Sequence, residues 1–142
     1  MDNEKTIELF FKVLETAKEK GREVSYSKRY NAFGIDYTIY SIRVDGPSYK
    51  EVDGKQVKIE FGFDASIDLT IKKETIEKSW FRKEDVEIIT ISGNVQEFTF
   101  SKTCDRNDKC FKKIIKLHED EDTRQEKLKE IKYNDLLKKE GL

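Results

Sequence analysis

The sequence predicts an α+β fold, in which an N-terminal amphipathic helix packs on a curved, mainly antiparallel sheet of five to six strands and a charged helix follows at the C-terminus. Two observations support this fold class. From Val57 to Lys72, apolar and polar residues alternate without a break, which is typical of a sheet with one buried and one solvated face. Near the N-terminus, apolar residues recur at three- and four-residue spacing, which is typical of an amphipathic helix: Ile7, Phe10, Phe11, Leu14 and Ala17.

The composition is compatible with a single folded domain. The 142 residues are enough to bury a core, and we expect one domain over 1–142, with 1–118 as its core and 119–142 as the charged helix. Charged residues make up 40% of the chain, yet the formal net charge is −1, so the molecule as a whole should not attract nucleic acid. No secretory signal and no membrane-spanning apolar run are visible, so we expect a cytoplasmic protein without membrane contact.

Local signals define the first helix and the first strand. Asn3 is the expected N-cap of the helix, and Gly21 is the expected residue just beyond its C-terminal cap. The segment 24–30 alternates weakly between apolar and polar residues, which predicts a strand.

The segment 35–44 is rich in β-branched and aromatic residues and predicts a second strand. Its apolar side chains change face between Ile39 and Tyr40, so we expect either a bulge or burial on both faces there. The segment 45–48 contains a glycine and the single proline, which indicates a turn.

The alternating run from Val57 to Lys72 is too long for one ordinary strand. At about 3.3 Å per residue, a straight strand of this length would exceed about 50 Å. We therefore expect a bend or break near Gly62, Phe63 and Asp64, because the missing side chain of Gly62 favours a β-bulge.

Two dipeptides predict two-residue hairpin turns. Asp53-Gly54 precedes the alternating run and tolerates the positive φ values of a type I′ turn. Gly93-Asn94 lies between two predicted strands, 86–92 and 95–103. In this second hairpin, the apolar side chains of both strands would share one face: Ile89, Ile91, Phe98 and Phe100.

Two later segments lack a clear pattern. Alternation is lost over 72–81, where Ile76 and Trp80 lie four residues apart and predict a short helix or helical turn. The segment 111–117 fits either a strand or a helix, and we expect a third strand that continues the meander. The final helix is expected over 119–139, acidic at its start and basic at its end, as the helix dipole favours.

The residues of common enzyme mechanisms are missing. His118 is the single histidine, and neither a nucleophile elbow nor a glycine-rich phosphate-binding motif occurs. Asp64 and Asp68 share the polar face of the alternating run, but no neighbouring residue in the sequence would shift their pKa values, so a solvated sheet face is expected. We therefore predict a non-enzyme without a cofactor.

Cys104, Cys110 and His118 are the candidate metal ligands, but their spacing matches no zinc motif, and no metal site is predicted. A disulfide between the two cysteines would form if they faced each other across a hairpin. In a reducing cytosol, two free thiols are the expected state.

Basic residues gather in two places that suit phosphate contacts. One cluster is Lys28, Arg29 and Tyr30. The other lies on a predicted hairpin over 95–117 and consists of Lys102, Arg106, Lys109, Lys112, Lys113 and Lys116. Solvated lysines that protect an edge strand from aggregation explain the same residues without any function.

Trp80 and Phe81 form the densest aromatic pair outside the patterned strands. The simplest interpretation is that they close the end of the core. If they are exposed, aromatic residues next to Arg82 and Lys83 would make a hot spot for a protein partner.

We therefore predict a small, non-catalytic protein-binding module, such as an inhibitor or accessory factor of a phage or other mobile element. The first alternative is nucleic-acid binding through the 102–116 lysine cluster. The second is a small-ligand cup, and an enzyme of unfamiliar type also remains open. The cup would be lined by Phe61, Phe63, Phe98 and Phe100.

Overall fold

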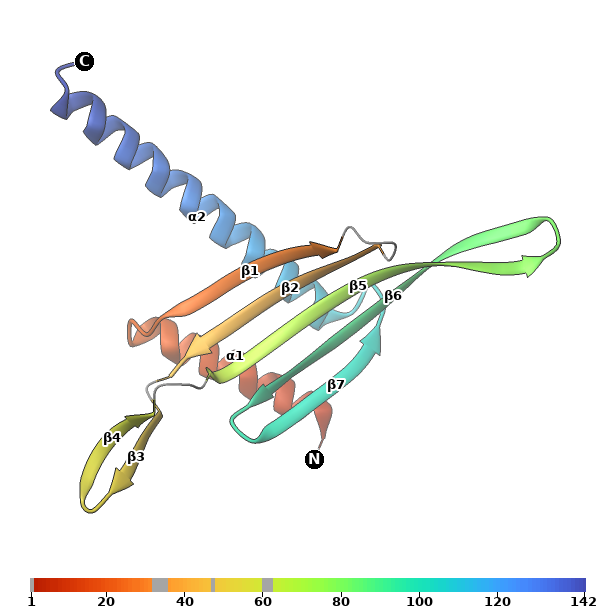
Figure 1. Ribbon diagram of the computed structural model, residues 1–142, viewed down its shortest axis with the longest axis horizontal. Coiled ribbons are helices and arrows are strands. Elements are labelled where there is room, and N and C mark those ends of the chain that lie inside the picture. The colour runs from red at the N-terminus through yellow and green to blue at the C-terminus, as the bar shows by residue number, and fades with distance from the viewer. Residues whose placement is uncertain (1, 32–35, 47, 60–62) are drawn as a thin grey trace.

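The computed structural model describes residues 2–31, 36–46, 48–59 and 63–142. Five antiparallel strands form one open sheet in the order β1-β2-β5-β6-β7, and β3 and β4 form a separate two-stranded hairpin (Figure 1). The predicted α+β fold with an antiparallel sheet is confirmed. The elements are α1 (Asn3–Glu19), β1 (Val24–Asn31), β2 (Asp36–Asp45), β3 (Ser48–Val52), β4 (Lys55–Ile59), β5 (Phe63–Ser79), β6 (Arg82–Val95), β7 (Phe98–Cys104) and α2 (Lys109–Lys139).

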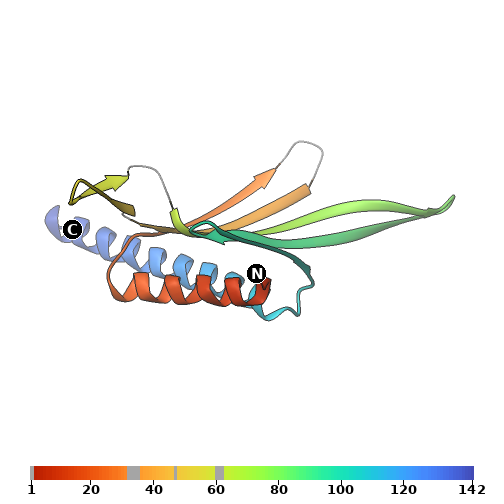
Figure 2. The same cartoon turned by 90° about the horizontal axis from the view of Figure 1, so that it is seen from below.

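Both helices lie on the same face of the sheet, and the other face is open (Figure 2). Helix α1 crosses beneath the sheet and buries the whole predicted apolar stripe, from Ile7 to Ala17. In the sheet, Ile67, Leu69 and Ile91 are fully buried on the face that the helices cover. Because every second residue of a strand faces the helices, the core is a single layer between the two helices and the sheet. In the described part of the chain, neither helix has the length and apolar character needed to cross a membrane.

The start of α1 differs from the prediction by one residue. Asp2, not Asn3, is the N-cap, and its side chain accepts a hydrogen bond from the backbone N–H of Glu4 at 2.9 Å. Asn3 instead pairs with the edge strand β7, where its Nδ2 donates to the Ser101 carbonyl at 2.8 Å. At the other end, Gly21 follows the C-cap with a φ of 68°, as predicted.

The long alternating run is divided between two strands, as expected. Strand β4 ends at Ile59 and β5 begins at Phe63, while Gly62 lies outside the described residues. In β5, the alternation corresponds to one buried and one solvated face, as predicted, because the helix-facing positions from Ala65 to Ile71 are buried. In β4 it does not, because Val57 is exposed on a hairpin that lies apart from the main sheet.

In β2, the change of face at Ile39 and Tyr40 corresponds to burial on both faces rather than to a bulge. Both side chains are half-buried, and the pairing of β2 with β1 and β5 continues through them without a shift. The register shift lies further along, between Val44 and Asp45. The turn predicted over 45–48 includes Pro47, which is outside the described residues.

One of the two predicted turns is confirmed. Asp53 and Gly54 join β3 to β4 with φ values of 53° and 76°, the signs that a type I′ turn requires. The turn at Gly93-Asn94 is wrong, because β6 continues to Val95 and pairs it with Phe98.

The physical reason is the packing at Gly93, which lies opposite Phe100 and beneath its ring. A side chain there would clash with that ring and with the backbone of β5, so glycine serves close packing and not a turn. The true register differs from the predicted one by an even number of residues. Ile89 and Ile91 therefore still share their face with Phe98 and Phe100.

Two assignments in the second half of the chain are wrong. The segment 72–81 contains no helical turn, because β5 continues as a strand to Ser79. The segment 111–117 is helical, because α2 begins at Lys109 rather than at residue 119. Asp108 caps this helix by accepting hydrogen bonds from the next backbone N–H groups, at 2.8 Å from that of Cys110. The first turns bury one face of α2 against the sheet and α1: Cys110, Phe111, Ile114 and His118.

Candidate partner-binding surface

The β5–β6 hairpin extends well beyond the rest of the sheet (Figures 1 and 2). The neighbouring strand β2 pairs with β5 only as far as Lys73, and β7 pairs with β6 only as far as Ile89. From there to the closing pair of Ser79 and Arg82, the two strands pair only with each other among the residues that the structure describes. At about 3.3 Å per residue, the unsupported part of β5 is about 20 Å long. We call this part, residues 74–86, the outer ribbon.

Trp80 and Phe81 form the turn at the end of the outer ribbon. Neither residue has a positive φ, in contrast to the turn at Asp53 and Gly54. Turns with negative φ values splay the strands of a hairpin, and an extra residue in one strand restores the twist. Lys78 is this extra residue, since the pairing shifts between Glu77 and Ser79. The bulge thus allows two large aromatic residues to occupy a tight turn.

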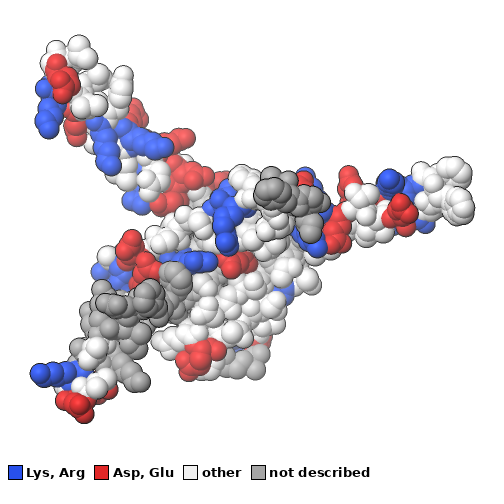
Figure 3. All heavy atoms as spheres, viewed as in Figure 1, with Lys and Arg blue, Asp and Glu red and all other residues white. Residues whose placement is uncertain are grey.

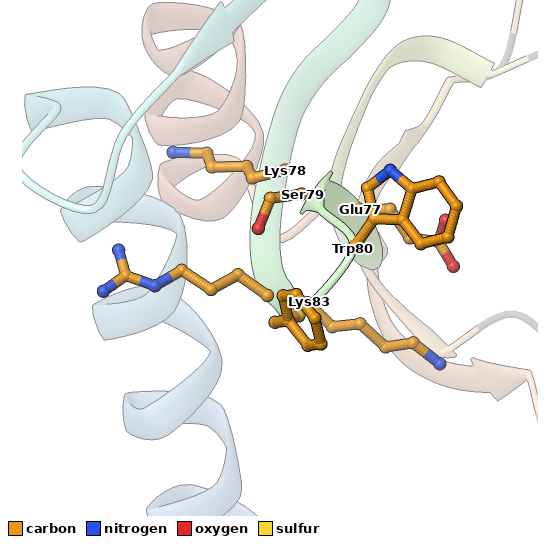
Figure 4. Close-up of a pocket in the computed structure, with 7 residues that line it drawn as sticks. Glu77, Lys78, Ser79, Trp80 and Lys83 are labelled. Carbon is orange, nitrogen blue, oxygen red and sulfur yellow. The ribbon is translucent and has the colours of Figure 1, made fainter.

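The two aromatic side chains are almost fully exposed, 98% for Trp80 and 96% for Phe81. They do not close the end of the core, which was the simpler interpretation of the sequence. Figure 4 shows Trp80 and Lys78 extending to opposite sides of the turn, with Lys83 on the side of Trp80. The hollow between these side chains is open to solvent, so the tip is a convex contact surface and not a ligand cavity.

Charged residues surround the aromatic tip. Within the outer ribbon, Lys78 forms an ion pair with Glu84, and its Nζ lies 2.5 Å from a carboxylate oxygen of that residue. Lys83 lies opposite Glu77 in the ladder, an arrangement that favours attraction across the strands. Arg82 follows the turn directly, so the tip combines an apolar apex with cationic side chains behind it. The structure therefore brings the predicted contact residues Trp80, Phe81, Arg82 and Lys83 together at one exposed end.

The predicted nucleic-acid cluster is divided. Lys102 is held between Glu4 and Asp108, at 3.1 and 2.9 Å, and joins α1 to the start of α2. Burial alone would lower the pKa of Lys102, but its hydrogen bonds to these carboxylates raise the pKa to about 12. Arg106 forms a two-pronged ion pair with Glu87. These two cations therefore have structural roles at the junction of helices and sheet.

Four of the clustered lysines remain on the surface. They lie on a helix and not on the predicted hairpin, at positions that share the solvent-facing side of α2: Lys109, Lys112, Lys113 and Lys116. Lys113 also covers the ring of Phe11 at 4.3 Å, and Lys116 pairs with Asp120 at 3.3 Å.

The tripeptide Lys28, Arg29 and Tyr30 is divided by the sheet, because successive residues of β1 face opposite sides. Lys28 lies over the rings of Tyr30 and Tyr40, at 5.1 and 4.9 Å, on the helix side. Arg29 faces the open side, so the three residues do not form one basic surface.

The cysteines are free thiols, as predicted. Burial raises the pKa of the Cys110 thiol to about 12, and it also raises the pKa of Cys104. Such thiols are poor nucleophiles and poor metal ligands at neutral pH. No group of three ligating side chains occurs in the described part of the chain.

His118 is buried where α2 meets β1 and β2, away from any metal-binding arrangement. Its ring packs edge-on against Tyr26 and Tyr40, with ring centres 5.4 and 5.2 Å away. Burial lowers the pKa of His118, so the imidazole is neutral at physiological pH. Its role in the structure is to dock α2 on the sheet.

The aromatic residues of the predicted cup do not line a common hollow. Phe100 is buried in the core, where its ring centre lies 6.5 Å from that of Phe10. Phe98, the first residue of β7, is 40% exposed. Phe61 and the side chain of Phe63 lie outside the described residues.

The alternation predicts a solvated sheet face, but the sequence does not show which polar side chains align across it. Cross-strand pairing aligns one polar residue from each strand in a single row: Ser27, Ser41, Asp68, Ser92 and Ser101. Within this row, Ser41 Oγ donates to Asp68 Oδ1 at 2.5 Å. Figure 3, which looks onto this face, shows few charged side chains at its centre. Alternating small polar residues were the available signal, but the row is visible only once the strand register is known. The side chain of Asp64 is outside the described residues.

Comparisons with protein-family models, with curated proteins and with solved structures find no match for this chain. The class of protein is therefore defined by its own features. It is an open-faced α+β domain that carries an aromatic residue pair at the end of a projecting hairpin.

Proposed function

We propose that this chain is a non-catalytic module that binds a protein partner through the tip of the β5–β6 hairpin. The observation that supports the proposal is the nearly complete exposure of Trp80 and Phe81. Adjacent large apolar side chains that stay exposed often mark an interaction site, and Trp and Arg are enriched among the residues that dominate binding energy. Arg82 and Lys83 behind the tip would contact an acidic rim on the partner.

Burial of the two rings could offset much of the free-energy cost of association, and further contacts with the partner would supply the net affinity. An aromatic side chain removes roughly 150–250 Å² from water when it is buried. At about 25 cal/mol per Å², this corresponds to about 4–6 kcal/mol for each of the two rings, as an upper estimate. The sum is comparable with the roughly 4–15 kcal/mol that association costs in lost freedom of motion. The reach of the outer ribbon suits insertion of the tip into a cleft, which is how an inhibitor would act.

The test is affinity capture from a lysate of the native host with three forms of the chain. These are the wild type, the double variant Trp80→Ala/Phe81→Ala, and the control Tyr133→Ala, which shortens an exposed aromatic residue on α2. A stoichiometric protein that is captured by the wild type and the control, but not by the double variant, supports the proposal. Equal capture by all three forms would refute it. Co-sedimentation of the wild type with lipid vesicles, lost in the double variant, would assign the tip to a lipid surface instead.

Nucleic-acid binding is a second candidate, favoured by the four lysines that share the outer side of α2's first turns: Lys109, Lys112, Lys113 and Lys116. Binding of this kind weakens steeply as salt rises, so it should be measured at low ionic strength first. Charge reversal at Lys109 and Lys112 should abolish it. If the wild type has no affinity for DNA or RNA at low salt, this candidate is refuted.

A further inference from the structure

The two edges of the five-stranded sheet differ in how they are closed. Strand β7 forms one edge, and the side-chain amide of Asn3 pairs with its backbone. This amide donates to the carbonyl of Ser101 at 2.8 Å and accepts from the N–H of the same residue at 3.4 Å. It thus takes the place of a neighbouring strand at this point. At the other edge, no strand of the described part of the chain lies beyond β1.

The hydrogen bonds of the sheet show which backbone groups of β1 point away from it. The N–H of Asp45 donates to the carbonyl of Glu23 at 3.0 Å, so the β1–β2 ladder starts with a hydrogen-bonded pair. Hydrogen-bonded and non-hydrogen-bonded pairs alternate along an antiparallel ladder. Every second residue of β1 therefore directs its N–H and C=O outward: Val24, Tyr26, Lys28 and Tyr30. These groups are the alternating donors and acceptors that an added strand requires.

The charges on β1 select against a second copy of this chain as the added strand. Both charged residues of β1 are basic, Lys28 and Arg29. Pairing β1 with itself would bring four cations together on one short ladder, whereas a segment that carries carboxylates is attracted to them. Helix α2 also passes beneath this edge, where the ring of His118 packs against Tyr26. In a two-fold pair, α2 of the second copy would have to pass beneath the same two strands. The edge therefore suits a single extended segment.

A hollow beside the first half of this edge also favours carboxylates. It lies between the end of α1, the start of β1 and α2, and it is lined by Lys18, Arg22, Val24, Tyr26, Glu121 and Arg124. The carboxylate of Glu121 already pairs with Arg124 at 2.8 Å, so the lining has an excess of positive charge. Side chains of an added strand that lie opposite Val24 and Tyr26 would face this same side of the sheet. A carboxylate at such a position would be attracted into the hollow.

Helix α2 continues past the edge and would lie beneath a strand added there (Figure 1). The side of α2 that faces the sheet includes Ile114 and His118. At intervals of three and four residues, the same side continues through Glu121 and Gln125 to Leu128. From Glu121 to Leu128 the helix rises by about 10 Å, which is about twice the spacing of neighbouring strands. Leu128 is 40% exposed, and an added strand would cover part of it.

We propose that the outer edge of β1 binds an extended, acidic segment of a partner protein as a sixth strand of the sheet. The outward backbone groups from Val24 to Tyr30 form the hydrogen bonds, and carboxylates beside Lys28 and in the hollow select the sequence of the segment. This surface shares no residue with the hairpin tip and does not depend on the function proposed above.

The first test uses a phage-displayed library of random linear peptides, selected for binding to the whole chain. We expect the enriched peptides to bind Lys28→Pro at least about tenfold more weakly than Lys28→Val. Both variants lose the cation, but only proline lacks the outward N–H and places its ring on the edge. The Lys28 N–H is outside the β1–β2 ladder, so proline is tolerated there, and circular dichroism should confirm that both variants fold.

The hairpin-tip variant Trp80→Ala/Phe81→Ala is the second control, and it should bind the same peptides as tightly as the wild type does. The absence of any enriched peptide would overturn the proposal. Equal binding by Lys28→Pro and Lys28→Val would also overturn it, and so would peptides that are lost only in the tip variant.

Single N-methylation along an enriched peptide tests the strand geometry. A methyl group on an N–H that faces β1 should abolish binding, while one on the next residue should be tolerated, because successive N–H groups of a strand point in opposite directions. The loss should therefore recur at every second residue. Loss at consecutive residues, or at none, would show that the peptide is not an added strand.

Two further measurements test the identity of the segment. Replacing the carboxylates of an enriched peptide with amides should weaken binding about two- to fivefold for each group, and an unchanged affinity would overturn the assignment of an acidic partner. Sedimentation equilibrium of the whole chain without peptide should show a monomer. A dimer that is lost in Lys28→Pro would assign the edge to a second copy of this chain and overturn the proposal.

Discussion

Replacing Gly93 with alanine should destabilise the whole domain without changing its surface. A Cβ atom at this position would lie 2.1 Å from the carbonyl oxygen of Ser66 and 2.7 Å from Cζ of Phe100. The φ of Gly93 is not in the left-handed region, so the cost is steric and does not come from backbone strain. Overpacking of a core costs typically 1–3 kcal/mol. The closest clash here is with backbone, so we expect a loss of about 3 kcal/mol or more in the free energy of unfolding.

Urea unfolding followed by circular dichroism measures this loss. Gly21→Ala is the control, because the space around Gly21 is empty and only its positive φ of 68° opposes a side chain. A second variant, Gly93→Ala/Phe100→Leu, removes the clash with the ring and keeps the clash with the Ser66 carbonyl. It should therefore remain unstable. A midpoint for Gly93→Ala equal to that of the wild type, or full recovery in the double variant, would refute this account of the packing.

Three other predictions concern stability. The double variant Trp80→Ala/Phe81→Ala should change the free energy of unfolding by less than about 0.5 kcal/mol, because both rings are exposed; a loss of several kcal/mol in urea unfolding would show that they are part of a core. Burial lowers the pKa of His118, so the unfolded chain takes up its proton first, and stability should fall as the pH drops below about 6.5. His118→Leu should remove this part of the pH dependence in urea titrations, and an unchanged profile would contradict it. Asp108→Ala should cost about 1–2 kcal/mol, because it removes the N-cap of α2 and one partner of Lys102; circular dichroism during thermal unfolding would show no shift if the cap were unimportant.

The parts of the fold that the sequence predicted are those where one face of an element is buried. The stripe from Ile7 to Ala17 and the alternation from Ala65 to Ile71 both point at the core, so their period reports the structure directly. The turn at Asp53 and Gly54 was predictable because its chemistry is local.

The failures have an equally physical origin. In the outer ribbon neither face is buried, so burial does not impose an alternation of apolar and polar residues. Ile76, for example, is 42% exposed. At the start of α2, the residues that face the core include Cys110 and His118, which interrupt the apolar spacing that would identify a helix. Gly93-Asn94 is a dipeptide typical of a hairpin turn, but Gly93 is needed for close packing against Phe100. The sequence alone does not show that Phe100 lies against it.

The candidate site was predictable in its residues but not in its exposure. The sequence identified Trp80 and Phe81 as an unusual pair, yet whether they lie in the core or in water depends on where β2 and β7 end. That is a property of the four strands β2, β5, β6 and β7 together. No local pattern around the aromatic pair contains it.

The outer ribbon also has a dynamic consequence. Two strands without a packed layer are only marginally stable in water, whereas the roots of the same strands are fixed by buried residues such as Ile71 and Ile89. The ladder should therefore open from the tip inward, with fast amide hydrogen exchange near Ser79 and strong protection near Leu69. A partner that holds the tip would then slow exchange along the whole ribbon, and part of the binding energy would be spent on ordering it.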